Sequence, residues 1–231
     1  MAEKRQEVVD SYVNIKDPQN VMNFLERNLK IVRGLIDRAM EAKLYCYLGT
    51  AYHKRGDFRK AKEYFEQHLK ISKEVGDREE EGGAYGNLGH AYYSFGDFQR
   101  AKEYYERQLK ISKEVGDRAG EGRAYGSLGI AYHSLGDFQR AIEYHNRYLE
   151  ISKELGDRTG EGGAYGNLGS TFVILNDFPK ALEYHKRHLK ISKEVGDRAG
   201  EGIAYGNLGN AYDGLGDFQK AIKYHERHLE I

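Results

Sequence analysis

Apolar residues recur along the chain at the spacing of amphipathic helices. In residues 79–94 they return every three or four positions, which marks one face of a helix, at Ala84, Tyr85, Leu88, Ala91 and Tyr92. A second stripe of the same kind follows a short interruption and consists of Phe98, Ala101, Tyr105, Leu109 and Ser112, running on to Val115. The pattern therefore predicts two consecutive helices.

Turn and capping residues bound these two helices. Gly96 interrupts the first stripe, and Asp97 stands where an N-cap of the second helix is expected. Gly116 is placed to end the second helix, and Asp117 begins the same sequence of signals again. The unit is a helical hairpin.

This hairpin recurs every 40 residues. Gly-Asp-Phe occurs at Gly56, Gly96, Gly136 and Gly216, and Asn176-Asp177-Phe178 fills the remaining place. Such a period is typical of a repeat array. The expected repeats are 39–78, 79–118, 119–158, 159–198 and a partial 199–231, and residues 1–38 are expected to form a degenerate N-terminal capping repeat.

A hairpin of this size has apolar stripes that its two helices cannot cover alone, so each hairpin must stack on its neighbours. Independent small domains are a poor alternative, because 40 residues make too small a core and no Pro/Ser-rich linker separates the units. We expect an all-α fold: a single continuous α-solenoid of stacked antiparallel helix hairpins.

Composition narrows the function classes. The 36 Lys and Arg residues balance 36 Asp and Glu, which argues against a nucleic-acid partner or an anionic membrane surface. Cys46 is the only cysteine, so no internal disulfide can form and a reducing, cytoplasmic location is expected. Neither a signal-peptide core nor a stretch of about 20 apolar residues is present, so no membrane insertion is expected.

The pattern Tyr85, Leu88, Gly89, Tyr92, Gly96, Asp97, Phe98, Ala101, Tyr105 and Leu109 resembles the tetratricopeptide repeat. The 40-residue form, with RHLKISKEVGDRAGEG followed by AYGNLG, resembles the repeats of the Pins/LGN scaffold family. This resemblance implies a right-handed superhelix in which the first helices form a concave face that holds an extended or helical peptide.

One face of the first helix changes freely between repeats, and we call it the variable face. Three sets of equivalent positions on this face, one residue from each repeat, follow helical spacing along the first helix. The Asn residues beside them carry amides that can pair with a peptide backbone. The candidate peptide-binding residues are His53, Asn87, His90, Tyr93, Arg123, Ile130, His133, Asn167, Ser170, Asn207, Asn210 and Asp213.

Glycine occupies positions where some members of the family hold a C-terminal carboxylate with Lys. These positions are Gly86, Gly126, Gly166 and Gly206, so the resemblance favours an internal peptide segment as the ligand. Glycine in a helix interior costs about 1 kcal/mol relative to Ala. Two explanations remain open: Gly82, Gly83 and Gly86 leave a smooth floor for a partner's backbone, or stacking simply tolerates them.

Catalytic and metal chemistry is weakly indicated. His185 with His188, and His225 with His228, have a spacing that can present two ligands, but no further ligand completes either pair, and the histidines at 145, 185 and 225 take the place of Phe65 and Tyr105. Cys46 is interpreted as a buried structural thiol. We expect neither an enzyme nor a cofactor.

Two functions remain. The first is a scaffold or adaptor that binds a partner protein or peptide on the variable face. The alternative is a structural array that self-associates through an open C-terminal end at Leu229, Glu230 and Ile231, where one hairpin is left uncovered.

Overall fold

The computed structural model describes residues 18–35 and 37–231, and these residues form helices joined by short turns, with no strand among them. The helices are α2 (Pro18–Leu35), α3 (Arg38–Lys54), α4 (Phe58–Val75), α5 (Arg78–Ser94), α6 (Phe98–Val115), α7 (Arg118–Ser134), α8 (Phe138–Leu155), α9 (Arg158–Ile174), α10 (Phe178–Val195), α11 (Arg198–Gly214) and α12 (Phe218–Leu229). The all-helical prediction is confirmed.

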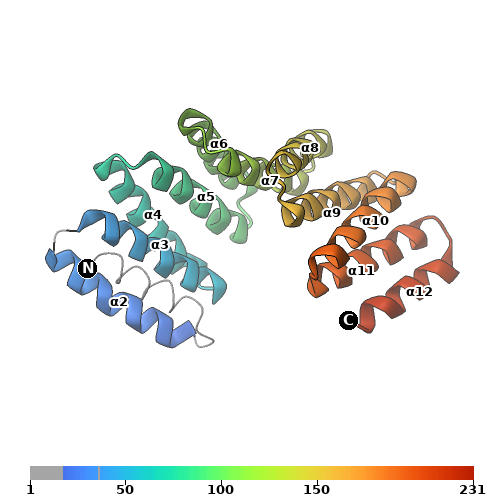
Figure 1. Ribbon diagram of the computed structural model, residues 1–231, viewed down its shortest axis with the longest axis horizontal. Helices are drawn as coiled ribbons and strands as arrows, with labels where there is room; N and C mark the ends of the chain where they lie inside the picture. Colours follow the sequence, from blue (N-terminus) through green and yellow to red (C-terminus); the bar gives the residue numbers. More distant parts are fainter. Residues whose placement is uncertain (1–17, 36) are drawn as a thin grey trace. The chain divides into compact units, whose positions relative to one another are not determined.

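The chain divides into two compact units, residues 1–117 and 118–231. In the first unit α2 packs on α3, and the hairpins α3–α4 and α5–α6 stack through α4 and α5 (Figure 1). In the second unit the hairpins α7–α8, α9–α10 and α11–α12 stack in the same way. First helices of successive hairpins also touch, as α3 with α5 and α9 with α11. Stacked antiparallel hairpins are therefore present in each unit.

The predicted turn residues work as expected. The Asp97 carboxylate accepts a hydrogen bond of 3.1 Å from the Arg100 backbone N–H, which caps α6. Gly96 and Gly116 have φ values of 78° and 74°, in the left-handed region that suits glycine at helix ends. Asn176 takes the place of the glycine with φ 58°, which Asn adopts more readily than other non-glycine residues.

The core is made of the predicted stripes. The first-helix stripe from Ala84 to Tyr92 is buried, and so are Ala101, Tyr105 and Ser112 of α6. Phe98 and Leu109 of the predicted second stripe are half-buried. Val115 is a correction, because it is exposed in the last turn of α6. The inner stripe ends one turn earlier, at Ile111 and Ser112.

One aromatic pair per hairpin joins the first helix to the second. Tyr92 and Tyr104 stack with ring centroids 5.2 Å apart. Equivalent stacked pairs are Tyr52–Tyr64, Tyr132–Tyr144, Phe172–Tyr184 and Tyr212–Tyr224. These pairs account for part of the high tyrosine content, because each repeat needs one on each helix.

Glycine permits the closest helix contact in each hairpin. A Cβ placed on Gly89 would lie 2.4 Å from the Tyr105 ring, and one placed on Gly169 would lie 2.5 Å from the His185 ring. Both distances are far inside a normal carbon contact of about 3.5–4.0 Å. Gly89 and its equivalents therefore allow the two helices of a hairpin to pack closely.

Charged residues tie the ends of each hairpin together. Arg118 at the start of α7 forms ion pairs with Glu121, at 2.9 Å, and with Glu154 at the end of α8, at 2.7 Å. Arg38, Arg78 and Arg158 make the same two contacts in their own hairpins. The pairs with Glu74, Glu114, Glu154 and Glu194 are exposed and of modest strength, whereas Glu41, Glu81 and Glu161 are buried beneath their arginines.

Two further expectations concern the chain as a whole. The capping repeat at residues 1–38 lies partly outside the described residues, which begin at Pro18, and its described part is α2. Among the described helices, none has the length and apolar character needed to span a bilayer.

Candidate functional site

In the first unit the predicted variable-face residues are exposed or half-buried, and all four make contacts inside the fold. The Asn87 amide donates a hydrogen bond of 3.4 Å to Cys46 Sγ. His53 Nε2 lies 2.9 Å from Ser94 Oγ, and the ring of His53 packs on Phe58. Tyr93 packs on Phe98, with centroids 5.0 Å apart. His90 Nδ1 lies 3.0 Å from the Tyr105 hydroxyl.

In the second unit Arg123, Ile130, Asn210 and Asp213 are exposed, and His133, Asn167, Ser170 and Asn207 are half-buried. His133 Nδ1 lies 3.1 Å from Thr171 Oγ1, which links the first helices α7 and α9. Thus His53 and His133, which hold equivalent positions in their repeats, connect neighbouring first helices. The variation between repeats did not indicate this role.

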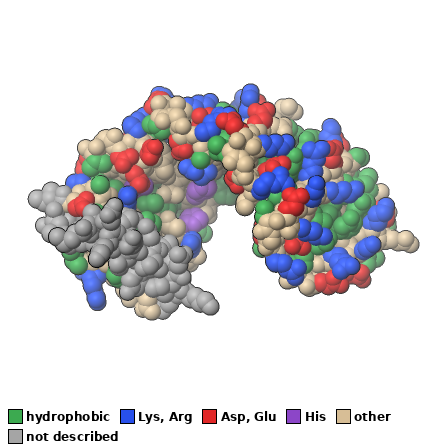
Figure 2. All heavy atoms as spheres, in the orientation of Figure 1, with side chains coloured by type: hydrophobic (Ala, Val, Ile, Leu, Met, Phe, Trp, Pro, Cys, Tyr) green, Lys and Arg blue, Asp and Glu red, His purple; other side chains and the backbone are tan. Residues whose placement is uncertain are grey.

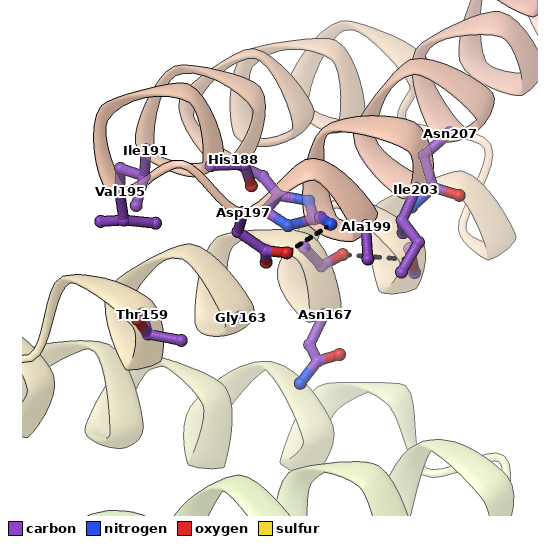
Figure 3. A pocket seen from close by; sticks show the side chains of 14 residues that line it. Thr159, Gly163, Asn167, His188, Ile191, Val195, Asp197, Ala199, Ile203 and Asn207 are labelled. Carbon is purple, nitrogen blue, oxygen red and sulfur yellow. Dashed lines mark hydrogen bonds between the residues drawn. The ribbon is translucent and has the colours of Figure 1, made fainter. Parts of the chain in front are cut away.

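A cavity of about 360 Å³ lies in the second unit between the first helices α9 and α11, with α10 beside them (Figure 3). Its walls bring together three of the predicted residues: Asn167, Ser170 and Asn207. Arg123, Ile130, His133, Asn210 and Asp213 do not line it.

The cavity combines apolar walls with free amides. Ile191, Val195 and Ile203 supply aliphatic surface, and Ile203 is 56% exposed. The side-chain amides of Asn167 and Asn207 form no hydrogen bond with any described residue. Each amide offers two donors and one acceptor, which is the set that pairs with a peptide group.

His188 forms the inner end of this cavity. Its side chain is 8% exposed, and Nδ1 has no hydrogen-bond partner among the described residues. A Cβ placed on Gly166 would lie 3.1 Å from that nitrogen, so the ring is aimed at the glycine of α9. Burial lowers the pKa of His188, although Asp197 opposes the shift, so the ring is neutral near pH 7.

The Asp197 carboxylate is committed to the fold. Its Oδ1 accepts a hydrogen bond of 2.9 Å from the Gly200 backbone N–H at the start of α11 (Figure 3). The Ser170 hydroxyl donates a hydrogen bond of 3.0 Å to the Gly166 carbonyl. The two Asn amides and the buried His188 nitrogen are left for a ligand.

The prediction of a smooth glycine floor needs correction. Gly82 and Gly86 are buried, and a Cβ on either would contact Ile111 or Gln108 of α6. By contrast, Gly83 and its equivalent Gly163 are exposed, with no atom near the place of a Cβ. Gly83 and Gly163 are thus the described glycines inside the first helices that have open space beside them.

Among the cavity residues, Gly163 and Ile203 belong to the variable face of the first helices, whereas His188 and Val195 lie on α10. His188 belongs to a second helix, whereas the predicted binding residues all lie on first helices. The sequence signal that indicates His188 is a comparison of equivalent positions across the repeats. A histidine of the second helix faces a position of the first helix that is repeatedly glycine, as His188 faces Gly166.

Metal binding gains no support from the described residues, which contain no cluster of three or more His, Cys, Asp or Glu side chains arranged to hold an ion. His185 is fully buried against Gly169 and acts as a core residue. On the face shown in Figure 2, acidic and basic side chains are interspersed over each unit.

The tetratricopeptide repeat family matches this chain at residues 80–154 and 161–231, and a second description of the same repeat matches residues 42–74. No curated protein matches significantly. The matching family descriptions are of repeats and indicate no catalytic family.

Among solved structures, the chain is similar to BtubC (BKLC) from P. vanneervenii, with 27% identity, a TM-score of 0.81, and coverage of 94% of this chain and 91% of that one. It shares its fold with aspartyl phosphate phosphatase F from Bacillus subtilis, at 14% identity, a TM-score of 0.76, and coverage of 97% and 67%.

A putative kinesin light chain from Podosopora anserina with nearly identical TPR-like repeats shows the same fold, at 19% identity and a TM-score of 0.68. The match covers 81% of this chain and 92% of that one. Because the repeat family covers more than half of the residues and the stacked hairpins agree with it, this chain belongs to the tetratricopeptide repeat family.

Proposed function

We propose that this protein is a scaffold that binds an extended segment of a partner protein, and that the cavity between α9 and α11 is its main anchoring site. The observation that carries the proposal is a cavity whose aliphatic walls stand beside two unpaired amides, Asn167 and Asn207. The repeat family supports protein–protein interaction in general.

The dimensions suit one anchoring side chain. A volume of about 360 Å³ is near the lower end of the range for ligand sites, about 300–1,000 Å³. An aliphatic partner side chain would cover Ile191 and Ile203, while the Asn amides pair with the peptide groups on either side of it. The ligand chemistry is therefore an apolar residue within an extended backbone.

The glycines at the positions expected for a carboxylate-binding Lys support an internal segment as the ligand. Gly166 and Gly206 provide no cation for a C-terminal carboxylate. With a balanced charge and a single cysteine, the same proposal includes a cytoplasmic adaptor without catalysis, cofactor or nucleic-acid partner.

The test uses a random peptide library selected on the immobilised protein, followed by fluorescence anisotropy with the enriched peptides. Gly163→Arg is the decisive variant, because it places a long side chain at the cavity wall in a position where the preceding repeat carries Arg123. Gly83→Arg makes the same change at the equivalent place in the first unit and is the matched control.

We expect Gly163→Arg to weaken binding at least tenfold, or about 1.4 kcal/mol, and Gly83→Arg to leave it unchanged. Asn167→Ala with Asn207→Ala should weaken it too, whereas Lys186→Ala on the exposed surface of α10 should not. Equal affinities for wild type and Gly163→Arg would refute the anchoring site.

Self-association is a second candidate, favoured by one observation. Phe218 and Ile222 of α12 are 62% and 59% exposed, whereas Leu182, the equivalent of Ile222 in α10, is buried beneath α11. A second copy would cover this apolar face. Sedimentation velocity should then show growth with concentration for the wild type and not for Ile222→Glu, and a constant monomer would exclude it.

A further inference from the structure

Cys46 interrupts the glycine column of the first helices. Its equivalents are Gly86, Gly126, Gly166 and Gly206. At Gly166 a Cβ would lie 3.1 Å from His188 Nδ1, and the residue equivalent to His188 beside Cys46 is His68. The geometry of the repeat therefore places the Cys46 side chain against the His68 ring, and the thiol is half-buried rather than buried as the sequence suggested.

His68 is held on its far side by a carboxylate. The ring is 1% exposed, and Nε2 lies 2.9 Å from Oε2 of Glu80, on α5. The later repeats have glycine at the place of Glu80: Gly120, Gly160 and Gly200. The other ring nitrogen, Nδ1, is buried, has no conventional hydrogen bond, and interacts with Cys46.

A third group completes the surroundings of the sulfur. The Asn87 amide of α5 donates a hydrogen bond of 3.4 Å to Cys46 Sγ. Thus α3 supplies the thiol, α4 supplies His68, and α5 supplies Glu80 and Asn87. This combination occurs in one repeat only, since no other repeat has Cys or Glu at these positions.

The charges agree with this geometry. Burial lowers the pKa of His68, but Cys46 and Glu80 together outweigh it and raise the pKa to about 9. Hydrogen bonding to His68 lowers the pKa of Glu80 despite its burial, and Lys43 of α3 adds to that effect. The imidazole is therefore protonated near neutral pH and stands between a carboxylate and a sulfur. A cation and an N–H donor beside a sulfur stabilise its thiolate.

We propose that Cys46 is a thiol-exchange site at which small disulfides form a reversible mixed disulfide with the protein, with His68, Glu80 and Asn87 as positioning residues. The Cys46 thiolate attacks one sulfur of the disulfide, a new S–S bond forms, and the original S–S bond breaks. The departing sulfur takes the electron pair and the proton held by His68. Cys46 is thereby oxidised, and half of the small disulfide is reduced to a thiol.

No second cysteine exists in the chain to displace the adduct. The mixed disulfide therefore persists until an external thiol attacks it. The adduct stands between α3 and α5, at the place in the first unit that corresponds to the Gly166 wall of the cavity in the second. This inference does not depend on the proposed peptide site.

The experiment measures the rate at which Cys46 reacts with 5,5′-dithiobis(2-nitrobenzoic acid) and with glutathione disulfide between pH 5 and pH 9. Mass spectrometry identifies the adduct. His68→Gln is the main variant, because Gln108 occupies the same position in the next repeat and is compatible with the fold. Glu80→Gln removes the carboxylate charge, and the urea-unfolded wild type gives the reactivity of the same thiol without its neighbours.

The native wild type should react about fivefold or more faster than His68→Gln at pH 6. Glu80→Gln should shift the profile in the same direction as His68→Gln. A wild-type profile that coincides with that of His68→Gln, or a native rate below the unfolded rate at every pH, would overturn the proposal. Circular dichroism confirms that each variant is folded.

Discussion

Alanine at two glycines of the same helix should have opposite effects on stability. Gly163 and Gly169 both lie inside α9. A Cβ at position 163 meets no atom within 4 Å, whereas a Cβ at position 169 would lie 2.5 Å from Cε1 of His185, whose side chain is fully buried. Because the substitution is the same at both positions, the difference in stability between the two variants reports how the second helix packs against α9.

The magnitudes follow from the two environments. Gly163→Ala should gain about 1 kcal/mol from helix propensity alone. In Gly169→Ala the His185 ring must move by about 1 Å to restore a normal contact of about 3.5–4.0 Å. Overpacking of this kind costs about 1–3 kcal/mol. The upper end applies because His185 is fully buried, and the gain of about 1 kcal/mol in helix propensity leaves a net loss of about 2 kcal/mol.

Thermal unfolding followed by circular dichroism at 222 nm tests both values. For a chain of this size about 1 kcal/mol corresponds to about 2–4 °C, so Gly163→Ala should raise Tm by about that amount and Gly169→Ala should lower it by about 4–8 °C. Combining Gly169→Ala with His185→Ala should recover more than about 1 kcal/mol relative to the sum of the single changes. An unchanged or raised Tm for Gly169→Ala would refute the close approach of α9 and α10.

Three further predictions concern titration and capping. Burial lowers the pKa of His145 and of His185 to about 4, below the value of about 6.5 in the unfolded chain. As the pH falls, the unfolded chain therefore takes up protons first. The free energy of unfolding should fall between pH 6.5 and pH 4, by up to about 3 kcal/mol per histidine. His185→Phe, which copies Phe65 of the first complete repeat, should flatten that dependence in urea titrations at several pH values, and an unchanged slope would contradict it. Asp97→Ala should lower the free energy of unfolding by about 1 kcal/mol, while Asp97→Asn should keep most of it; equal losses in urea unfolding would show that the cap is not the cause.

The sequence was sufficient for the hairpin and its period. Spacings of three and four residues identified the buried stripe from Ala84 to Tyr92, and Gly96 with Asp97 located the turn, because these signals depend on neighbours along the chain. Val115 was misplaced because its spacing continues the stripe, although α6 ends there at Gly116 and the Val115 side chain is exposed.

The site was harder to predict, since its geometry depends on contacts between helices. Variation between repeats indicated that His53 and His133 face outward, but both side chains bond to the next first helix, which a periodic pattern does not reveal. Gly86 seemed to leave open space, yet Gln108 of the second helix fills it. The spacing along the chain determines which face of its helix a residue lies on. It does not determine how far a side chain of the neighbouring helix extends toward that face.

The cavity between α9 and α11 is tested most directly by the NMR signals of the Asn167 and Asn207 side-chain amides during titration with a selected peptide. If the peptide backbone pairs with these amides, both signals should shift at the same peptide concentration and exchange more slowly with water. Shifts confined to the outer surfaces of α10 and α12, with both amide signals unchanged at saturation, would show that the partner binds elsewhere.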